Sequence, residues 1–389
     1  STFEGNTATQ GSGGAISCSN CDSMTFEQST TFQNNAAGGT TTDAGGGAIH
    51  FTSPKNTITS SGSLFLSNTA EMSGGALHAN HGTWTSTNDQ FTQNVALSGS
   101  GGAASATATL VHFDETTSCT ENRATKGGGG CMVWESEASN LQDEKWDTYK
   151  PNISNMKLIQ DNRALFGASF ATPGAALSIK DVKQITTNDN NILGPVYPVV
   201  DVQDWYGQSV KGFLAADISV VAKLKENAAK LFGATTMKAD AGGSASFTEL
   251  GLQGLPGSIH NMYFEAVLSD NSKRFLNTAA GKLLVAMIKI CPEGSKPDDS
   301  GTACEKCSPG LFEEGRTVCN ECPIGQYQSV GGQQKCVQCP VDSYSNEPGK
   351  SSAADCTLCP DKTTTGKSVG NIRASACICQ EGYYQTKRG

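Results

Sequence analysis

The sequence predicts an all-β chain with a right-handed parallel β-helix, an immunoglobulin-like β-sandwich and disulfide-rich modules that hold little regular secondary structure. Three observations predict this order. A Phe-x-x-Asn and Gly-Gly-Ala motif recurs through residues 1–171, short apolar runs occupy residues 172–290, and 11 of the 15 cysteines lie in residues 291–389. We therefore expect three domains with these boundaries.

The N-terminal repeat joins Phe-x-x-Asn, or a near variant, to Gly-Gly-Ala and an aliphatic residue. Its Gly-Gly pairs begin at residues 13, 46, 74, 101 and 129, and a degraded sixth copy ends at residues 166–168. Such a period indicates a stack of small structural units. Because the copies are rich in Gly, Ser, Thr and Asn and poor in helix formers, we expect about six β-coils rather than helical pairs.

The recurring asparagine is expected to form a ladder along the stack. Its amide both donates and accepts hydrogen bonds, so it can serve backbone groups at a turn that no strand satisfies. Ligand binding is the alternative role for these residues. The ladder positions are Asn6, Asn35, Asn68, Asn94, Asn122 and Asn162.

The paired Phe-x-x-Asn and Gly-Gly-Ala-Ile signature, complete at Phe32, Asn35 and residues 46–49, resembles the repeat of the polymorphic outer-membrane proteins. These are surface β-helices of bacteria that also occur in extracellular proteins of protists and algae. The resemblance covers roughly residues 1–171. It implies a cell-surface or adhesive scaffold and brings no catalytic residues.

Four cysteines lie in the predicted β-helix. Cys18 and Cys21 are close together just after a Gly-Gly-Ala-Ile segment, so we expect a local disulfide. Cys119 replaces the Phe of its coil and Cys131 replaces the Ala, so both side chains should point inward. The sequence leaves open whether they form a bridge or remain two buried thiols.

Residues 172–290 show the spacing of a β-sandwich, with apolar or alternating runs between clusters of Gly, Asn, Asp and Pro. The runs lie at 176–179, 196–202, 218–224, 262–268 and 283–290. The stretch from residue 242 to residue 267 resembles the latter half of a bacterial or invasin-like immunoglobulin domain. One helix candidate, residues 221–232, is short enough to be two strands instead.

The C-terminal cysteines include four Cys-x-x-Cys pairs, which raises the question of zinc. Each pair is followed by a turn-rich phrase such as Cys-Pro-Ile-Gly-Gln-Tyr at residues 322–327, and this context favours disulfides over a zinc site. The phrases resemble the cysteine-rich repeats of the ephrin-receptor-like class, relatives of the tumour-necrosis-factor-receptor modules. That resemblance implies the pairs Cys291 with Cys304, Cys307 with Cys319, Cys322 with Cys336, Cys339 with Cys356, and Cys359 with Cys377.

Cys379 is then left over at the start of an unfinished unit. We expect that the natural chain continues past Gly389, and that Ser1 enters a repeat already in progress, so that the sequence is a piece of a longer secreted protein.

An acidic insert, roughly residues 134–156, interrupts the repeat before its sixth copy. Its aromatic residues Trp134, Trp146 and Tyr149 are the candidate contact surface, because insertions must loop out of a stack. The alternative is a flap that covers the side of its own coil. The insert also holds the one N-linked sequon, so glycosylation is expected at Asn152.

No catalytic, cofactor or metal site is expected. The aspartates of the repeat occupy scattered coil positions, whereas enzymes of this architecture cluster charged residues on one outer face. His50 and His78 share one position in adjacent copies, with His81 nearby, but serines hold that position in other copies. A plain side-chain ladder therefore explains these histidines better than a metal site does.

The charge balance restricts the partners. The chain has 28 basic and 37 acidic residues and a net charge of −9, which argues against nucleic acid and anionic membranes. No apolar run approaches the roughly 18 residues needed to span a bilayer. The cysteine density indicates an extracellular or cell-surface location.

Two classes of function remain, with a β-helix carbohydrate-active enzyme as a distant third. The first is a glycosylated structural protein that joins copies of itself or other fibre proteins into a surface fibril or flagellar hair, resembling mastigoneme-type proteins of protists and algae. The second is an adhesin or receptor ectodomain that binds a partner such as a glycan. An open β-helix end, which must be capped or continued, favours the fibre.

Overall fold

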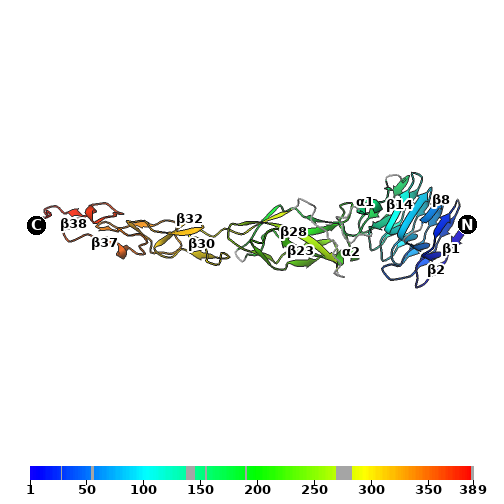
Figure 1. Ribbon diagram of the computed structural model, residues 1–389, viewed down its shortest axis with the longest axis horizontal. Helices are drawn as coiled ribbons and strands as arrows, with labels where there is room; N and C mark the ends of the chain where they lie inside the picture. The colour runs from blue at the N-terminus through cyan, green and yellow to red at the C-terminus, as the bar shows by residue number, and fades with distance from the viewer. Residues whose placement is uncertain are drawn as a thin grey trace.

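The computed structural model describes residues 1–386 except residues 28, 54–56, 137–144, 154–155, 189–190 and 269–282. The protein is nearly all β, with 44% strand and 4% helix. Three modules follow one another along a single long axis, with the N-terminus at the β-helix end and the C-terminus at the cysteine-rich end (Figure 1). The predicted fold class is therefore confirmed.

Three parallel sheets run along the β-helix, and every pairing in them joins one coil to the next. The first sheet consists of β1 (Thr2–Glu4), β5 (Thr31–Gln33), β9 (Leu64–Leu66), β12 (Gln90–Thr92), β15 (Ser118–Thr120) and β18 (Leu158–Gln160). The second consists of β2 (Thr7–Ala8), β6 (Ala36–Ala37), β10 (Thr69–Ala70), β13 (Val95–Ala96) and β16 (Arg123–Ala124). The third consists of β3 (Ile16–Ser19), β7 (Ile49–Thr52), β11 (Leu77–Thr87), β14 (Ala104–Phe113), β17 (Met132–Glu135) and β19 (Phe170–Ala171), with β4 (Ser23–Phe26) and β8 (Thr57–Ser61) beside it.

A column of aromatic rings fills the interior behind the first sheet. Phe3, Phe32, Phe65 and Phe91 stack nearly parallel, with successive ring centroids 4.8, 5.0 and 4.6 Å apart. These distances match the spacing of neighbouring strands, because each ring belongs to one coil. The parallel register continues the column through Cys119.

The two glycines of each Gly-Gly pair are required for different structural reasons. The first glycine has a positive φ, for example +71° at Gly101, which L-residues rarely adopt. The second lies against the next coil, since a Cβ on Gly102 would be 2.1 Å from the carbonyl oxygen of Gly130. In the sixth coil Ala168 holds that second position, and its carbonyl accepts a hydrogen bond from Gly130.

Replacing Gly102 with alanine is expected to destabilise the β-helix by about 3 kcal/mol, because the added methyl group forces two coils apart. Urea unfolding of the full chain measures this change. Gly11→Ala is the control, since the nearest atom to its Cβ would be 3.8 Å away. Equal unfolding midpoints for the two variants would contradict the close-stacking argument.

The second module is a two-sheet sandwich with a small additional ribbon. One sheet consists of β20 (Ala176–Ile179), β22 (Val199–Gln203) and β26 (Ser244–Ser246). The other consists of β21 (Gln184–Thr186), β29 (Leu284–Met287), β28 (Ile259–Leu268), β23 (Ile218–Leu224) and β25 (Thr236–Lys238). The ribbon pairs β24 (Lys230–Gly233) with β27 (Leu250–Gln253), and a short helix, α2 (Phe213–Ala216), precedes β23.

This topology answers whether residues 221–232 form a helix or two strands. Its first part belongs to β23 and its last part to β24, so the strand alternative is correct. Buried side chains between the two sheets of the sandwich, among them Val200, Phe247 and Phe264, form one core.

The third module is a chain of small hairpins. They pair β30 (Ser295–Pro297) with β31 (Cys304–Lys306), β32 (Leu311–Glu314) with β33 (Val318–Glu321), β34 (Gln326–Tyr327) with β35 (Val337–Gln338), β36 (Ser343–Tyr344) with β37 (Thr357–Leu358) and β38 (Thr363–Thr364) with β39 (Ile378–Cys379). Two 3₁₀ turns, η2 (Ala353–Asp355) and η3 (Ala374–Ala376), lie between strands.

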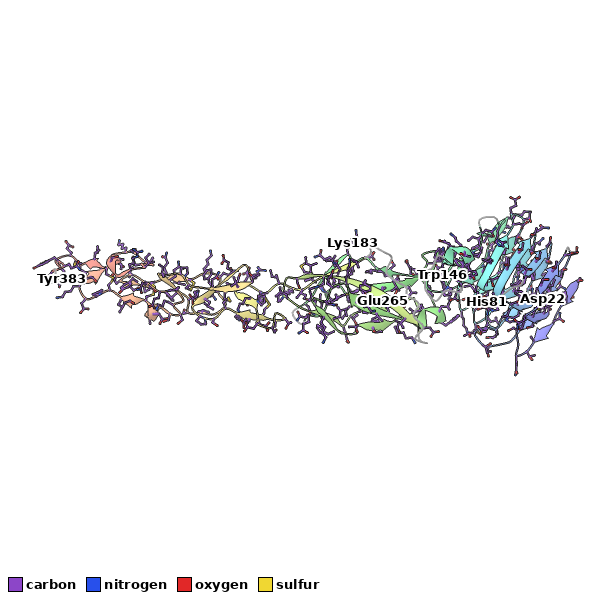
Figure 2. The ribbon with its side chains drawn as sticks, viewed as in Figure 1. Asp22, His81, Trp146, Lys183, Glu265 and Tyr383 are labelled. Atoms are coloured by element: carbon purple, nitrogen blue, oxygen red, sulfur yellow. A yellow bond between two sulfur atoms is a disulfide. The ribbon has the colours of Figure 1, made fainter. Side chains whose placement is uncertain are left out.

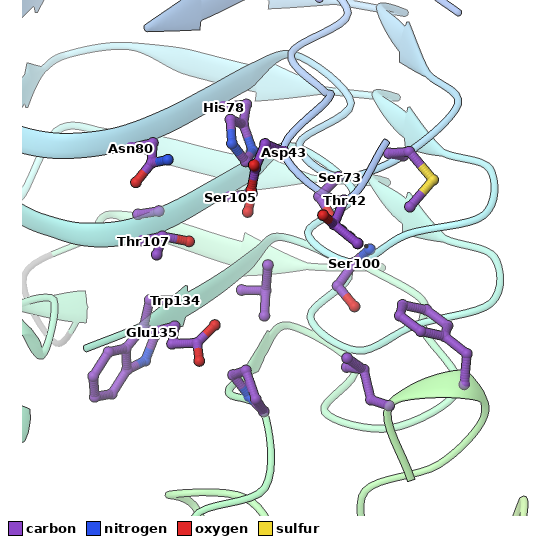
Figure 3. A pocket seen from close by; sticks show the side chains of 16 residues that line it. Thr42, Asp43, Ser73, His78, Asn80, Ser100, Ser105, Thr107, Trp134 and Glu135 are labelled. Atoms are coloured by element: carbon purple, nitrogen blue, oxygen red, sulfur yellow. Dashed lines mark hydrogen bonds between the residues drawn. The ribbon is translucent and has the colours of Figure 1, made fainter. Parts of the chain in front are cut away.

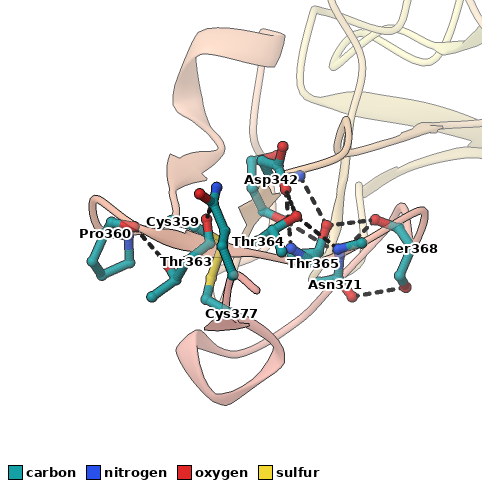
Figure 4. The surroundings of a disulfide bond; sticks show 12 residues. Asp342, Cys359, Pro360, Thr363, Thr364, Thr365, Ser368, Asn371 and Cys377 are labelled. Atoms are coloured by element: carbon teal, nitrogen blue, oxygen red, sulfur yellow. Dashed lines mark hydrogen bonds between the residues drawn. A yellow bond between two sulfur atoms is a disulfide. The ribbon is translucent and has the colours of Figure 1, made fainter. Parts of the chain in front are cut away.

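Consecutive hairpins are joined by a repeated backbone hydrogen bond. The carbonyls of Cys307, Cys322 and Cys339 accept from Gly332, Gly349 and Gly370, each in the following unit. Side chains add to this link, as where Asp342 accepts from the Thr365 amide at 3.0 Å beside the Cys359–Cys377 disulfide (Figure 4). The module is thus a linear stack of covalently closed loops.

The five disulfides of this module follow the pairing that the ephrin-receptor-like resemblance implies. Both β-helix pairs are also bonded, Cys18 with Cys21 and Cys119 with Cys131, whose Cα atoms lie 6.0 Å apart across the coil. The question left open for Cys119 and Cys131 is therefore answered by a bridge. Cys379 is an exposed free thiol.

Reduction is expected to unfold the third module selectively. Its hairpins bury few apolar side chains besides the cysteines, whereas the sandwich contains no cysteine and keeps its own core. Limited proteolysis with and without reductant measures this, and cleavage should be confined to residues beyond 291. Equal resistance of all three modules after complete reduction would contradict it.

Candidate functional site

The asparagine ladder runs unbroken through all six coils. The side chain of Asn68 shows its repeating geometry: Oδ1 accepts from the backbone amide and from Nδ2 of Asn35, each at 3.0 Å. Nδ2 donates to the Phe32 carbonyl at 2.8 Å and to Asn94 Oδ1 at 3.0 Å. The same bonds link Asn6 to Asn35, Asn94 to Asn122 and Asn122 to Asn162.

The four inner members, Asn35, Asn68, Asn94 and Asn122, are at most 1% exposed. Their amide oxygens and nitrogens are already engaged with the neighbouring coils, so the predicted structural ladder is confirmed and the ligand-binding alternative finds no accessible group. The residue before each ladder asparagine has a positive φ, as at Gln93 (+58°), which turns the chain sharply toward the second sheet.

The described residues of the insert do not form the predicted contact surface. Trp134 and Trp146 are each 1% exposed, and Tyr149 is half-buried against the β-helix core. Trp146 lies on a short helix, α1 (Lys145–Tyr149), at the junction between the β-helix and the sandwich (Figure 2). Burying these large rings is energetically more favourable than leaving them exposed to water. The described part of the insert therefore agrees with the flap alternative.

These rings pack against Trp205, which follows β22 in the sandwich and was not among the residues singled out in the sequence. Its ring stacks on Trp146 with centroids 5.8 Å apart and an interplanar angle of 7°. The next residue, Tyr206, accepts a 2.9 Å hydrogen bond from the indole nitrogen of Trp134. One feature of the sequence points to this contact: Trp205 and Tyr206 are adjacent aromatic residues in a loop. Large rings in a loop stay exposed unless another segment of the chain covers them.

A buried carboxylate holds this loop against the last coil. Asp204 accepts from the backbone amides of Tyr206 and Gln208, at 2.9 and 2.8 Å. Gln208 in turn donates to the carbonyl of Phe170 in β19. Burial raises the pKa of Asp204 despite these bonds. The side chains of Phe166 and Ala171 from the sixth coil are also part of the sandwich core, so the two modules share one interior.

The two histidines that share one position of the repeat form a stacked pair. His50 and His78 have ring centroids 5.2 Å apart and are nearly parallel, as the register of β7 and β11 requires. Among the described residues no three His, Cys, Asp or Glu side chains come together as metal ligands. Burial, and to a smaller extent the neighbouring His50, lowers the pKa of His78 to about 3.

This shift predicts an acid-sensitive β-helix. The unfolded chain takes up a proton on His78 near pH 6.5, but the folded chain does not until about pH 3. Stability is therefore fully present above pH 6.5 and falls as the pH drops toward 3, by at most about 1.4 kcal/mol per pH unit for this group.

His78→Ser is expected to reduce that dependence, since Ser105 occupies the same position in the next coil. Urea unfolding of both proteins at pH 7, 5 and 4 measures the difference. Parallel stability curves for the parent chain and the variant would show that His78 does not titrate differently on folding.

The predicted glycosylation site lies at the end of the third sheet. The side chain of Asn152 bonds to both backbone groups of Phe113, accepting at 2.7 Å and donating at 2.9 Å, as a strand residue would. Ser154 of the sequon lies outside the described residues. Glycosylation at Asn152 remains a prediction, and its glycan would be attached to a nitrogen that holds the end of β14.

A pocket of about 260 Å³ opens beside this junction, and the sequence did not reveal it (Figure 3). Its floor is the outer face of the third sheet, including His78, Asn80 and Thr107. Turns that precede the Gly-Gly pairs form one side, and Phe213 and Leu214 of α2 form another. The pocket therefore exists only where the β-helix meets the sandwich.

Comparison with known proteins finds two short family matches. A family described as tyrosine-protein kinase ephrin type A/B receptor-like matches residues 311–356. The Chlamydia polymorphic membrane protein repeat matches residues 1–19. No curated protein and no solved structure matches the chain.

The matches agree with the resemblances of the two end modules, and each covers only a small part of the chain. No helix among the described residues is long and apolar enough to cross a membrane. Seven disulfides close loops in the first and third modules. Together with the two repeat families, these disulfides indicate that the chain is a cell-surface or extracellular protein.

Proposed function

We propose that this chain is a non-enzymatic structural subunit of an extracellular fibre, such as a surface fibril or a flagellar hair. The observation that carries the proposal is the linear arrangement of three modules in one narrow rod (Figure 1). A different feature stiffens each module: the buried asparagine ladder in the first, the hydrophobic core of the β-sandwich in the second, and the row of disulfides in the third.

The junction between the first two modules supports the same proposal. A freely hinged receptor needs only a short linker, whereas this junction buries Trp134 and Trp146 and shares a hydrophobic core. Two domains of one chain usually move relative to one another unless the interface between them is large and apolar. A shared interior of this kind suits a protein that transmits load along its axis.

Negative-stain electron microscopy of native material from the surface of the source organism tests the proposal. Regular filaments whose axial repeat matches the length of one rod are the expected result. Isolated rods on a membrane, together with a monodisperse monomer in sedimentation at high concentration, would contradict the fibre and favour an adhesin or receptor. Trp134 and Trp146 of the insert are buried, so these two side chains do not supply the contact surface of such an adhesin.

A further inference from the structure

The pocket at the junction has a polar floor. His78 is 4% exposed, and its Nδ1 has no hydrogen-bond partner among the described residues. Asn80, two residues along β11, likewise has a buried Oδ1 without a partner there. Both side chains face the pocket together with the hydroxyl-bearing Ser105 and Thr107 of the next strand (Figure 3). These two atoms are themselves buried, so the groups of the floor that a ligand can meet are the hydroxyl, amide and imidazole side chains that line the pocket. Such a floor favours a ligand that both donates and accepts hydrogen bonds.

The charges around the pocket exclude anions. Among the residues that the structure describes, no Lys or Arg lines it, while the carboxylates of Asp43 and Glu135 do. His78 is neutral at physiological pH because burial lowers its pKa to about 3. A phosphate, sulfate or carboxylate ligand would therefore find no cation to pair with and two like charges nearby.

Another wall of the pocket is apolar. Phe213 of α2 is 40% exposed, which is unusual for a large aromatic side chain, and it lines the pocket together with Leu214 of the same helix. An accessible aromatic ring in a pocket that also holds hydroxyl, amide and imidazole groups suits a ligand with one apolar C–H face and several hydroxyls. The volume of about 260 Å³ lies below the roughly 300–1,000 Å³ typical of drug-sized ligands.

We propose that this pocket binds a single neutral sugar residue of a glycan, with the polar floor of the third sheet reading its hydroxyls and Phe213 covering its apolar face. The site is built by two modules, so it is present only in the intact junction. Sugar binding is independent of fibre formation, and failure of either idea leaves the other standing.

Isothermal titration of the full chain with the methyl glycosides of glucose, galactose and N-acetylglucosamine tests the proposal. At least one of them should bind at one site with a dissociation constant of about 1 mM, as a few hydrogen bonds and one ring contact support. Phe213→Ala should weaken that binding about tenfold, and Asn80→Leu or Thr107→Val about threefold each.

Thr85→Val is the matched control, since Thr85 lies on the same strand as Asn80 but away from the pocket, and it should bind as the parent chain does. Saturation-transfer NMR with the same glycosides gives a second readout. Binding of none of the three at concentrations tenfold above the expected constant would overturn the proposal, as would binding that Phe213→Ala and Asn80→Leu leave unchanged.

Discussion

Replacing Asn68 with leucine is expected to lower the free energy of unfolding of the β-helix by about 4 kcal/mol. The side chain makes four buried hydrogen bonds, two to Asn35 and one each to Phe32 and Asn94. Each such bond contributes roughly 1 kcal/mol, and the partners that remain would be left unsatisfied inside the stack. Urea unfolding followed by hydrogen exchange in the β-helix measures the loss.

Asn6→Leu is the matched control at the end of the same ladder. Asn6 is exposed and donates only from its backbone amide and its Nδ2 to Asn35, so water can replace those bonds. Its effect should be below about 1 kcal/mol. Similar losses for both variants would mean that the ladder adds nothing beyond an ordinary surface contact.

Trp146→Ala is expected to destabilise the junction by about 3–5 kcal/mol, the usual cost of deleting a large buried aromatic side chain. Trp146 is 1% exposed and contacts both Trp134 and Trp205, with centroids 5.5 and 5.8 Å away. Because these rings couple the β-helix to the sandwich, the variant should unfold in two separate steps where the parent chain unfolds in one. Small-angle scattering should also show a more bent rod.

Thr148→Ala, an exposed position on the same short helix, should change neither the unfolding nor the scattering. The comparison separates the two roles considered for the insert. A contact surface would tolerate Trp146→Ala without loss of stability, whereas a flap that closes the coil would not.

The extent to which sequence predicted structure differed between the modules for a physical reason. In the β-helix, one coil repeats six times in register, so a position such as that of Asn68 or Gly102 has the same neighbours in every copy. In the cysteine-rich module, covalent bonds between near neighbours leave few arrangements. The insert carries no repeat and no cysteine. Its tryptophans were therefore predicted to be exposed, whereas the structure buries them.

The sequence by itself determined the order of the modules, the ladder and the glycine pairs, because each follows from local spacing that the chain repeats. The disulfide pairing of the third module came from the resemblance to the ephrin-receptor-like repeats. Only the tertiary structure decided that Trp146 meets Trp205 and that Phe213 and Asn80 line one pocket. These contacts join segments distant in the chain across a single junction. No periodic pattern encodes such a meeting, since it depends on how the last coil and the first sandwich loops bury their apolar surfaces together.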